Sequence, residues 1–318
     1  MGQRLELPLA TCPELRAPVL LAAFAGWGDG AMAGTNALQY LLSKHQAQRL
    51  GGFDPDEIYV YTTTRPVTLR RENGERELVW PSLELYACPL PAGKQDALLL
   101  LGPEPNLRWR GCARAILDAA IRCKARVVIV LGSYWDRVTH LGRPLLTARA
   151  ADHITRDALI ALRLPESGYQ GPTGFTSALL EACAQRGLPA AGISARAPHY
   201  AQGIAHPKLA LALLETVQRL LGLRFDLAEL EGASREYERL LTQRLQQEPR
   251  LWRYVQQLAA EQGQAGEVDD LARGPWQKIV AASPTTEQPA PAAESDLPSG
   301  QELVEAVEEF LRRSGRER

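Results

Sequence analysis

Unbroken apolar runs alternate along this chain with stretches of helical spacing, and this alternation predicts an α/β protein. The run at residues 97–101 is closed by Gly-Pro, so we expect a strand that is buried on both faces. Residues 109–120 follow with apolar positions at helical spacing, and a second unbroken run occupies residues 126–131. Strand, helix and strand in this order form the parallel crossover unit. The pattern therefore makes residues 97–101 a central strand of a sheet.

The remaining elements follow from the same two periodicities and from turn residues. Asn73-Gly74 is a strong hairpin signal between two short stretches of alternating apolar and polar residues. Further strands are predicted at residues 18–24, 58–62, 67–71, 77–80, 83–88 and 190–197, and helices at 31–43, 152–162, 175–186 and 209–221.

Polar side chains gather after the predicted strands, where open α/β sheets collect ligands and partners. The Gly-rich turn at residues 26–30 precedes a helix that Asp29 can cap, and Asn106 and Thr173 are predicted caps for the helices after them. The turns at residues 26–30 and 168–174 could each hold an anion or serve only as a capped helix start. The candidate binding rim comprises Trp27, Asp29, Glu104, Asn106, Arg108, Trp109, Arg137, His140, Arg143, Thr173, Gly174, His199, Tyr200 and Lys208.

A catalytic constellation does not emerge from these residues. His140 lies in an irregular stretch, residues 133–148, and could act as an acid or base near neutral pH. However, no Ser or Cys nucleophile with a fixed third partner is visible near it, so we predict a hydrogen-bonded structural histidine. We assign no catalytic residue. The five histidines form no metal-ligand cluster, and we expect neither a metal nor a cofactor.

The C-terminal part of the chain changes character after residue 225. Apolar positions at helical spacing on a charged background predict two amphipathic helices, broken near Pro249, as an extension at residues 226–262. Residues 263–300 have the composition of a flexible linker, and residues 301–318 hold an amphipathic helix. Its apolar face could dock onto a partner or fold back onto the core domain, residues 1–225. That face comprises Leu303, Val307, Phe310 and Leu311.

Composition and charge exclude several classes of protein. The chain has 318 residues and a formal net charge of -1, which gives no electrostatic reason to expect nucleic acid or an anionic membrane surface. No apolar run approaches the roughly 20 residues of a membrane span. The N-terminus lacks the pattern of a secretion signal. The five cysteines are scattered without a Cys-x-x-Cys pair, so we expect a cytoplasmic protein with reduced, mostly buried thiols.

Several spaced motifs together resemble the bacterial branch of the proteasome assembly chaperone 2 family. They are G-W-G-D-G at residues 26–30, G-P-E-P-N-L-R-W at 102–109, T-H-L-G-R-P at 139–144, Y-Q-G-P-T-G at 169–174, P-H-Y at 198–200 and P-K at 207–208. The resemblance implies a three-layer α/β/α fold with a mixed sheet like that of nucleoside phosphorylases and certain hydrolases. It also implies self-association, with a trimer as one candidate state.

Two classes of function follow from the resemblance and from the residues. The first is a non-catalytic, chaperone-like protein that binds a protein partner, with a proteasome-related partner as one candidate. The second is a small-molecule enzyme of the nucleoside phosphorylase or hydrolase kind, or an anion or nucleotide sensor, because arginines suit phosphate. We favour the first. The ending Ser-Gly-Arg-Glu-Arg differs from the hydrophobic-Tyr-x tail by which some archaeal relatives engage proteasomes.

Overall fold

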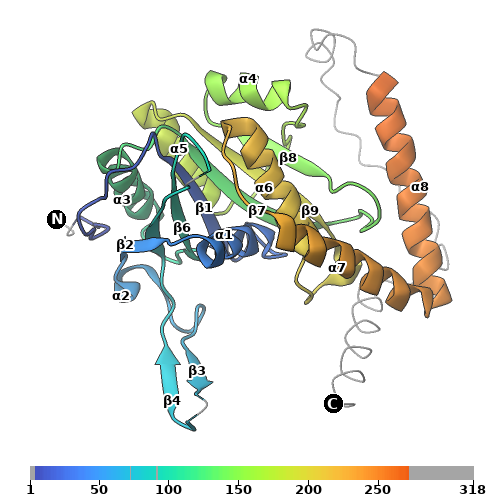
Figure 1. The fold of residues 1–318 in the computed structure, drawn as a ribbon, viewed down its shortest axis with the longest axis horizontal. Coiled ribbons are helices and arrows are strands. Elements are labelled where there is room, and N and C mark those ends of the chain that lie inside the picture. The colour runs from blue at the N-terminus through green and yellow to red at the C-terminus, as the bar shows by residue number, and fades with distance from the viewer. Residues whose placement is uncertain (1–3, 72, 91, 272–318) are drawn as a thin grey trace. The chain divides into compact units, whose positions relative to one another are not determined.

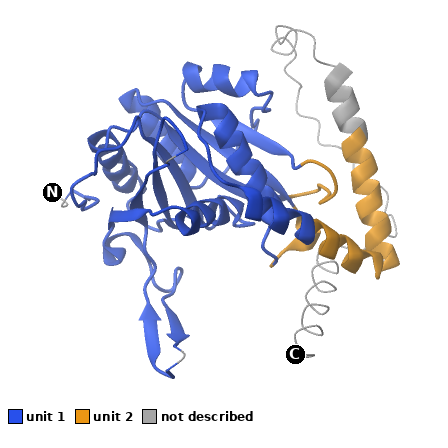
Figure 2. Cartoon of the chain, in the orientation of Figure 1, with its two compact units in different colours: residues 1–135, 144–197, 204–237 blue, residues 136–143, 198–203, 238–318 orange. Residues whose placement is uncertain are grey.

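The computed structural model describes residues 4–71, 73–90 and 92–271, with side chains up to residue 263. The chain forms two compact units, shown in blue and orange in Figure 2. Unit 1 comprises residues 1–135, 144–197 and 204–237, and unit 2 comprises residues 136–143, 198–203 and 238–318. The predicted terminal helix at residues 301–318 lies outside the described residues, as does most of the predicted linker.

A seven-stranded mixed sheet forms the centre of unit 1, with the strand order β2-β5-β6-β1-β7-β9-β8. Strand β1 pairs in parallel with both β6 and β7, which confirms the predicted crossover, and β5 pairs antiparallel to β6. The predicted central strand is therefore present at β6. The strands are β1 (Val19–Ala25), β2 (Gln48–Gly52), β5 (Glu84–Cys88), β6 (Ala97–Pro103), β7 (Val128–Asp136), β8 (Leu146–Ala150) and β9 (Ala190–Pro198).

Helices cover both faces of this sheet, which confirms the three-layer α/β/α fold. Alternate residues of β1 point to opposite faces, so Leu20 and Phe24 join one apolar core while Leu21 joins the other. The first core includes α3 and α5, and the second includes α1 and α6 (Figure 1). The helices of unit 1 are α1 (Ala33–Lys44), α2 (Pro55–Ile58), α3 (Trp109–Arg122), α4 (His153–Ala161), α5 (Phe175–Arg186) and α6 (Pro207–Leu221).

The predicted hairpin is present and extends away from the sheet of unit 1 (Figure 1). Its strands, β3 (Val67–Arg70) and β4 (Arg76–Val79), form a separate two-stranded antiparallel sheet. Every residue of both strands is exposed. Its apolar side chains are therefore not covered by the hairpin itself. A two-stranded hairpin is also only marginally stable alone in water.

Two long helices follow the sheet domain in the described part of the C-terminal region, where the sequence predicts two amphipathic helices. Helix α7 (Ala228–Gln246) begins in unit 1 and ends in unit 2, and α8 (Pro249–Leu271) starts at the predicted proline break. Within unit 2, Leu251, Val255 and Leu258 of α8 are buried at helical spacing. Helix α8 continues to Leu271, whereas the sequence predicted a linker from residue 263. Its Glu, Gln and Ala residues favour a helix strongly enough to continue past Gly263 and Gly266.

One predicted strand is wrong. Residues 58–62 alternate like a strand, but the structure has helix α2 followed by turns. The Asp54 carboxylate accepts a hydrogen bond from the backbone N–H of Asp56, and Pro55 occupies the first turn, so a helix starts here. The backbone N–H of Val60 then bonds to the Asn106 side chain rather than to a neighbouring strand.

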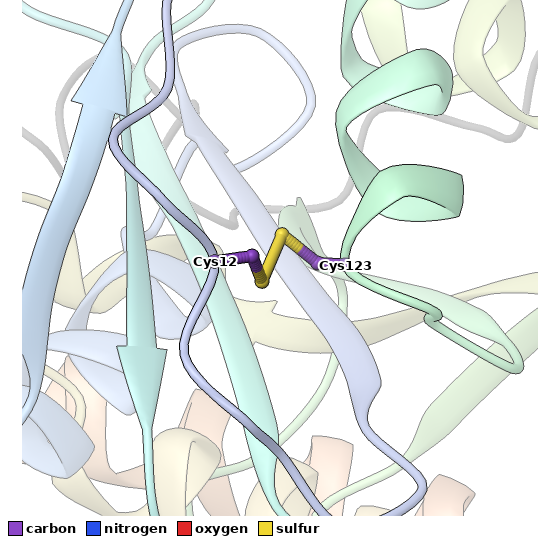
Figure 3. The surroundings of a disulfide bond; sticks show 2 residues. All are labelled: Cys12 and Cys123. Carbon is purple, nitrogen blue, oxygen red and sulfur yellow. A yellow bond between two sulfur atoms is a disulfide. The ribbon is translucent and has the colours of Figure 1, made fainter.

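The expectation of five reduced thiols is also wrong, because Cys12 and Cys123 form a disulfide (Figure 3). Their sequence separation of 111 residues is the reason that a search for local cysteine pairs misses them. The bond joins the segment before β1 to the end of α3. The other three cysteines, Cys88, Cys112 and Cys183, are free and buried, as predicted for most of the thiols.

Candidate functional site

The turn after β1 holds a carboxylate that is buried and fully engaged. Asp29 is 1 % exposed, and its Oδ1 accepts hydrogen bonds from the backbone N–H of Gly34 at 3.1 Å and from the Ser133 hydroxyl at 2.5 Å. Its Oδ2 accepts from the backbone N–H and hydroxyl of Thr35 at 2.7 and 2.8 Å. Burial raises the pKa of Asp29 above its usual value. Asp29 therefore satisfies two amides in the first turn of α1, although Met32 is the N-cap residue, and it links this turn to β7.

The second carboxylate, Glu104, comes directly after β6 and caps a helix that is distant in sequence. Its Oε1 accepts a hydrogen bond of 2.5 Å from the backbone N–H of Phe175, the first residue of α5. The predicted cap for this helix, Thr173, is wrong: the N-cap residue is Gly174, and the Thr173 hydroxyl bonds to that of Ser177. A carboxylate at a helix N-terminus satisfies the same amides that would otherwise attract an anion.

Two exposed aromatic rings lie beside this capped helix start. Trp27 and Tyr169 are in ring contact, with centroids 6.4 Å apart. A Cβ atom at Gly174 would lie 3.3 Å from the Trp27 ring and 2.8 Å from Glu104 Oε1, so both side chains border this glycine. Three motifs that are far apart in the sequence thus contribute Trp27, Glu104 and the segment from Tyr169 to Gly174 to one place.

The motif after Glu104 supports the neighbouring loop. Asn106 does not cap α3 as predicted, because its side-chain oxygen accepts hydrogen bonds from Val60 N–H at 2.9 Å and Thr64 Oγ1 at 3.0 Å. Arg108 is the N-cap residue instead, in the left-handed conformation with φ 54°. Asn106 therefore fixes the chain that leads into the β3–β4 hairpin.

Arg108 and Trp109 complete this part of the rim in unit 1. The Arg108 guanidinium forms an ion pair with Glu57 at 2.8 Å. The Trp109 indole N–H donates to the carbonyl of Pro105 at 2.5 Å, and its ring packs against Phe175. Lys208, the remaining candidate of unit 1, lies in the first turn of α6, which Pro207 opens as predicted.

The histidine candidates belong to unit 2, where the ring of each contacts a tyrosine hydroxyl. His140 is 4 % exposed, and its ring nitrogens contact Tyr200 Oη at 2.7 Å and Thr242 Oγ1 at 3.0 Å. This is the hydrogen-bonded role that the sequence predicted for His140. Burial raises the pKa of Tyr200 to about 12, so its hydroxyl stays protonated at neutral pH.

The other candidates of unit 2 are His199, Arg137 and Arg143. The His199 ring contacts the Asp136 carbonyl at 3.0 Å and the Tyr254 hydroxyl at 3.1 Å. Arg137 pairs with Glu261 at 3.7 Å, and Arg143 is exposed. The predicted rim residues are thus divided between two units.

Sequence reasoning missed Ser133 and Tyr169 as members of these arrangements. Ser133 accepts hydrogen bonds from the backbone N–H groups of Ala31 and Ala33 while it donates to Asp29. Its position directly after an apolar run was the available signal. Tyr169 opens one of the family motifs but has the bulky, exposed character of an ordinary loop residue.

Neither a metal-binding cluster nor a membrane-spanning helix is present among the residues that the structure describes. Within residues 4–71, 73–90 and 92–271, no three His, Cys, Asp or Glu side chains are grouped so that they could hold a metal ion. Over the same part of the chain, no helix combines the length and the apolar character needed to cross a membrane.

The fold and the converging motifs define a three-layer α/β/α protein with an aromatic and carboxylate cluster at its strand ends. The model of the PAC2 family matches residues 23–245, and the chain belongs to this family. No curated protein matches the chain.

Among solved structures, the chain is similar to the proteasome-assembly chaperone homologue of Mycobacterium tuberculosis. The two are 30 % identical with a TM-score of 0.68, over 74 % of this chain and 99 % of that one. A PAC2 family protein of Streptomyces avermitilis is also 30 % identical, with a TM-score of 0.64 over 71 % and 95 % of the chains. PbaB of Pyrococcus furiosus, an archaeal proteasome activator, shares the fold at 19 % identity and a TM-score of 0.58, over 75 % and 98 % of the chains.

Proposed function

We propose that this protein is a non-catalytic, chaperone-like protein that binds another protein, and that a proteasome-related protein is the first candidate partner. The membership of the PAC2 family supports the chaperone-like role, because relatives of this fold include a proteasome-assembly chaperone homologue and a proteasome activator. The proposal keeps two predictions from the sequence, a homo-oligomer, with a trimer in the first instance, and a cytoplasmic location, although the Cys12–Cys123 disulfide removes the argument from reduced thiols for that location.

The observation that carries the proposal is the β3–β4 hairpin. Val67 and Val79 are cross-strand partners, and Leu69 lies on the same face of the hairpin. Leu78 and Trp80 lie on the opposite face, and all five side chains are between 42 and 56 % exposed. Apolar side chains are thus exposed on both faces of one projecting hairpin, and exposed apolar surface of this kind commonly marks a site of protein interaction. The hairpin therefore has the form of an arm that packs against a partner.

The polar candidate residues already form hydrogen bonds within the protein, and this supports the non-catalytic part of the proposal. Asp29 is buried and occupied by four donors, and His140 is held between Tyr200 and Thr242. A general acid or base must reach the proton that it transfers, directly or through one water molecule. The Glu104 carboxylate also places negative charge where α5 could otherwise attract a phosphate group.

The test is affinity capture from the native cytoplasm followed by identification of bound proteins and metabolites. The bait is the full-length chain, compared with a double variant, Leu69→Ser and Leu78→Ser. Ile154 of α4 is 58 % exposed and provides the matched control, Ile154→Ser. We expect the same folded-state spectra for all three proteins and a discrete protein partner that only the hairpin variant loses.

Two outcomes would contradict the proposal. A bait that retains a metabolite but no protein would favour the enzyme or sensor. Phosphorolysis of common nucleosides that disappears in Arg108→Ala would establish turnover. The proposal also includes the predicted terminal helix as a second docking element, so a chain without residues 301–318 should keep a folded core and lose a protein interaction.

A further inference from the structure

Trp27 and Tyr169 are the two most exposed large apolar side chains among the described residues, at 61 and 62 %. Trp and Tyr are also the residue types that most often dominate the binding energy of protein interfaces. Their rings are in contact and lie at the carboxyl end of the sheet, far in sequence from each other. The pair is therefore a preassembled aromatic surface and not two scattered residues.

Local contacts orient the Tyr169 ring and fix the backbone that leads into Trp27. The Tyr169 hydroxyl donates to the carbonyl of Pro172 at 2.9 Å, which closes its loop and orients the ring. Trp27 follows Gly26, whose φ of 144° suits glycine and whose Cβ, if present, would lie 3.3 Å from that of Glu104. Rings that are ordered before binding lose little entropy when a ligand arrives.

A carboxylate completes the cluster. Glu104 Oε1 is used by the backbone N–H of Phe175, which leaves Oε2 able to accept from a ligand. Two basic side chains near the start of α5 and α3 have partners elsewhere: Arg149 donates to Ser177, and Arg108 pairs with Glu57. Across the part of the chain that the structure describes, no basic side chain forms an ion pair with Glu104.

We propose that Trp27, Tyr169 and Glu104 bind a cationic side chain, arginine first and lysine second, that a protein partner presents. This inference rests on the proposed function, because it names the chemistry of one contact with the partner. A guanidinium group can stack on an aromatic face and donate hydrogen bonds to a carboxylate at its edge. An anionic ligand would meet the Glu104 carboxylate and is disfavoured at the same place.

The probe is a short peptide, acetyl-Gly-Arg-Gly-amide, titrated into the full-length protein with ¹⁵N-labelled tryptophan. The indole N–H resonances of the six tryptophans report where the peptide binds. A peptide with citrulline, which has the shape of arginine without its charge, is the matched ligand. We expect a saturable shift of the Trp27 resonance and an affinity for citrulline that is lower by about tenfold, since charged hydrogen bonds and cation–π contacts are lost.

Two variants test the assignment to these side chains. Glu104→Gln keeps an oxygen for the Phe175 N–H but removes the charge, and it should weaken arginine binding to the level of citrulline. Tyr169→Ala should weaken both peptides. Ile154→Ala is the control, since Ile154 of α4 is similarly exposed and lies outside both proposed binding surfaces. Equal affinity for arginine and citrulline, or no shift of the Trp27 resonance up to the solubility limit of the peptide, overturns the inference.

Failure of this inference and failure of the proposed function give different results. If Trp27→Ala still captures the same protein partner with unchanged affinity, the cation site is wrong and the protein-binding role stands. If the arginine peptide binds as expected but the full-length bait captures no protein, the site is present and the proposed function is wrong.

Discussion

The buried Asp29 carboxylate provides the sharpest prediction about the strand-end turns: its replacement should affect folding. In Asp29→Ala, four donors lose their acceptor, namely the backbone N–H groups of Gly34 and Thr35 and the hydroxyls of Thr35 and Ser133. The two N–H groups are buried in the first turn of α1, and an unsatisfied buried donor costs roughly 1–3 kcal/mol.

Two effects reduce this cost. The hydroxyls of Thr35 and Ser133 can rotate toward other acceptors, and the variant no longer buries an ionised carboxylate, which burial disfavours, as the raised pKa of Asp29 indicates. We therefore expect Asp29→Ala to lower the free energy of unfolding by about 3 kcal/mol at pH 7. Asp29→Asn retains one acceptor oxygen and should cost about 1–2 kcal/mol. Asp157→Asn, on the exposed side of α4, is the control and should change the value by less than about 0.5 kcal/mol.

The difference in the free energy of unfolding between wild type and Asp29→Asn should depend on pH, and its direction follows from the raised pKa of Asp29. The pKa of Asp29 in the folded protein lies above the usual 3.8. Its protonated form therefore adds to the free energy of unfolding fully below pH 3.8, and this addition is lost as pH rises through the folded pKa. The deficit of Asp29→Asn relative to wild type should thus be larger at pH 4 than at pH 7. Urea unfolding followed by circular dichroism measures both values. Deficits equal to that of Asp157→Asn would refute the structural role of Asp29.

Three further predictions concern elements that hold unit 1 together. Asp96→Asn should destabilise the protein by about 2 kcal/mol at pH 7, because the variant loses the paired contacts to Arg16. The folded pKa of Asp96 is about 2, so the stabilisation by the Asp96 carboxylate is present above pH 3.8 and is lost toward pH 2, which acid unfolding measures. Peptide mapping without reductant should recover Cys12 joined to Cys123, and reduction of this disulfide by dithiothreitol should lower Tm. Burial raises the pKa of the Cys88 thiol to about 12, so Cys88 should resist alkylation until urea is added. Gly34→Ala would place a Cβ 2.4 Å from the carbonyl oxygen of Leu131 and should cost at least about 2 kcal/mol, while Gly168→Ala, which meets no atom within 4 Å, should be neutral in the same unfolding assay.

The elements that sequence reasoning predicted correctly are those whose signals are local. Strand β6 is an unbroken apolar run, and the β3–β4 hairpin has Asn-Gly at its turn. Residues 58–62 show the limit of such patterns. Their alternation is typical of a strand, but the preceding Asp54-Pro55 pair starts a helix and the Asn106 side chain takes the next backbone donor.

The parts that could not be predicted depend on contacts between distant residues. Glu104 caps α5 across 71 residues, so the nearer Thr173 was the natural choice from sequence. The disulfide between Cys12 and Cys123 likewise becomes visible only when the chain is folded. The same long-range assembly places Trp27 beside Tyr169, which no spacing rule for a single motif would suggest.

Site-specific photocrosslinking in the native cytoplasm tests the central claim, protein binding through the β3–β4 arm, most directly. A photoreactive residue at position 69 of the hairpin is compared with one at position 154 of α4, which is similarly exposed. The account predicts one discrete protein adduct at position 69 that is absent at position 154 and is lost when Val67, on the same face as position 69, is replaced by Ser. Adducts of the same pattern at both positions, or none at position 69, would contradict it.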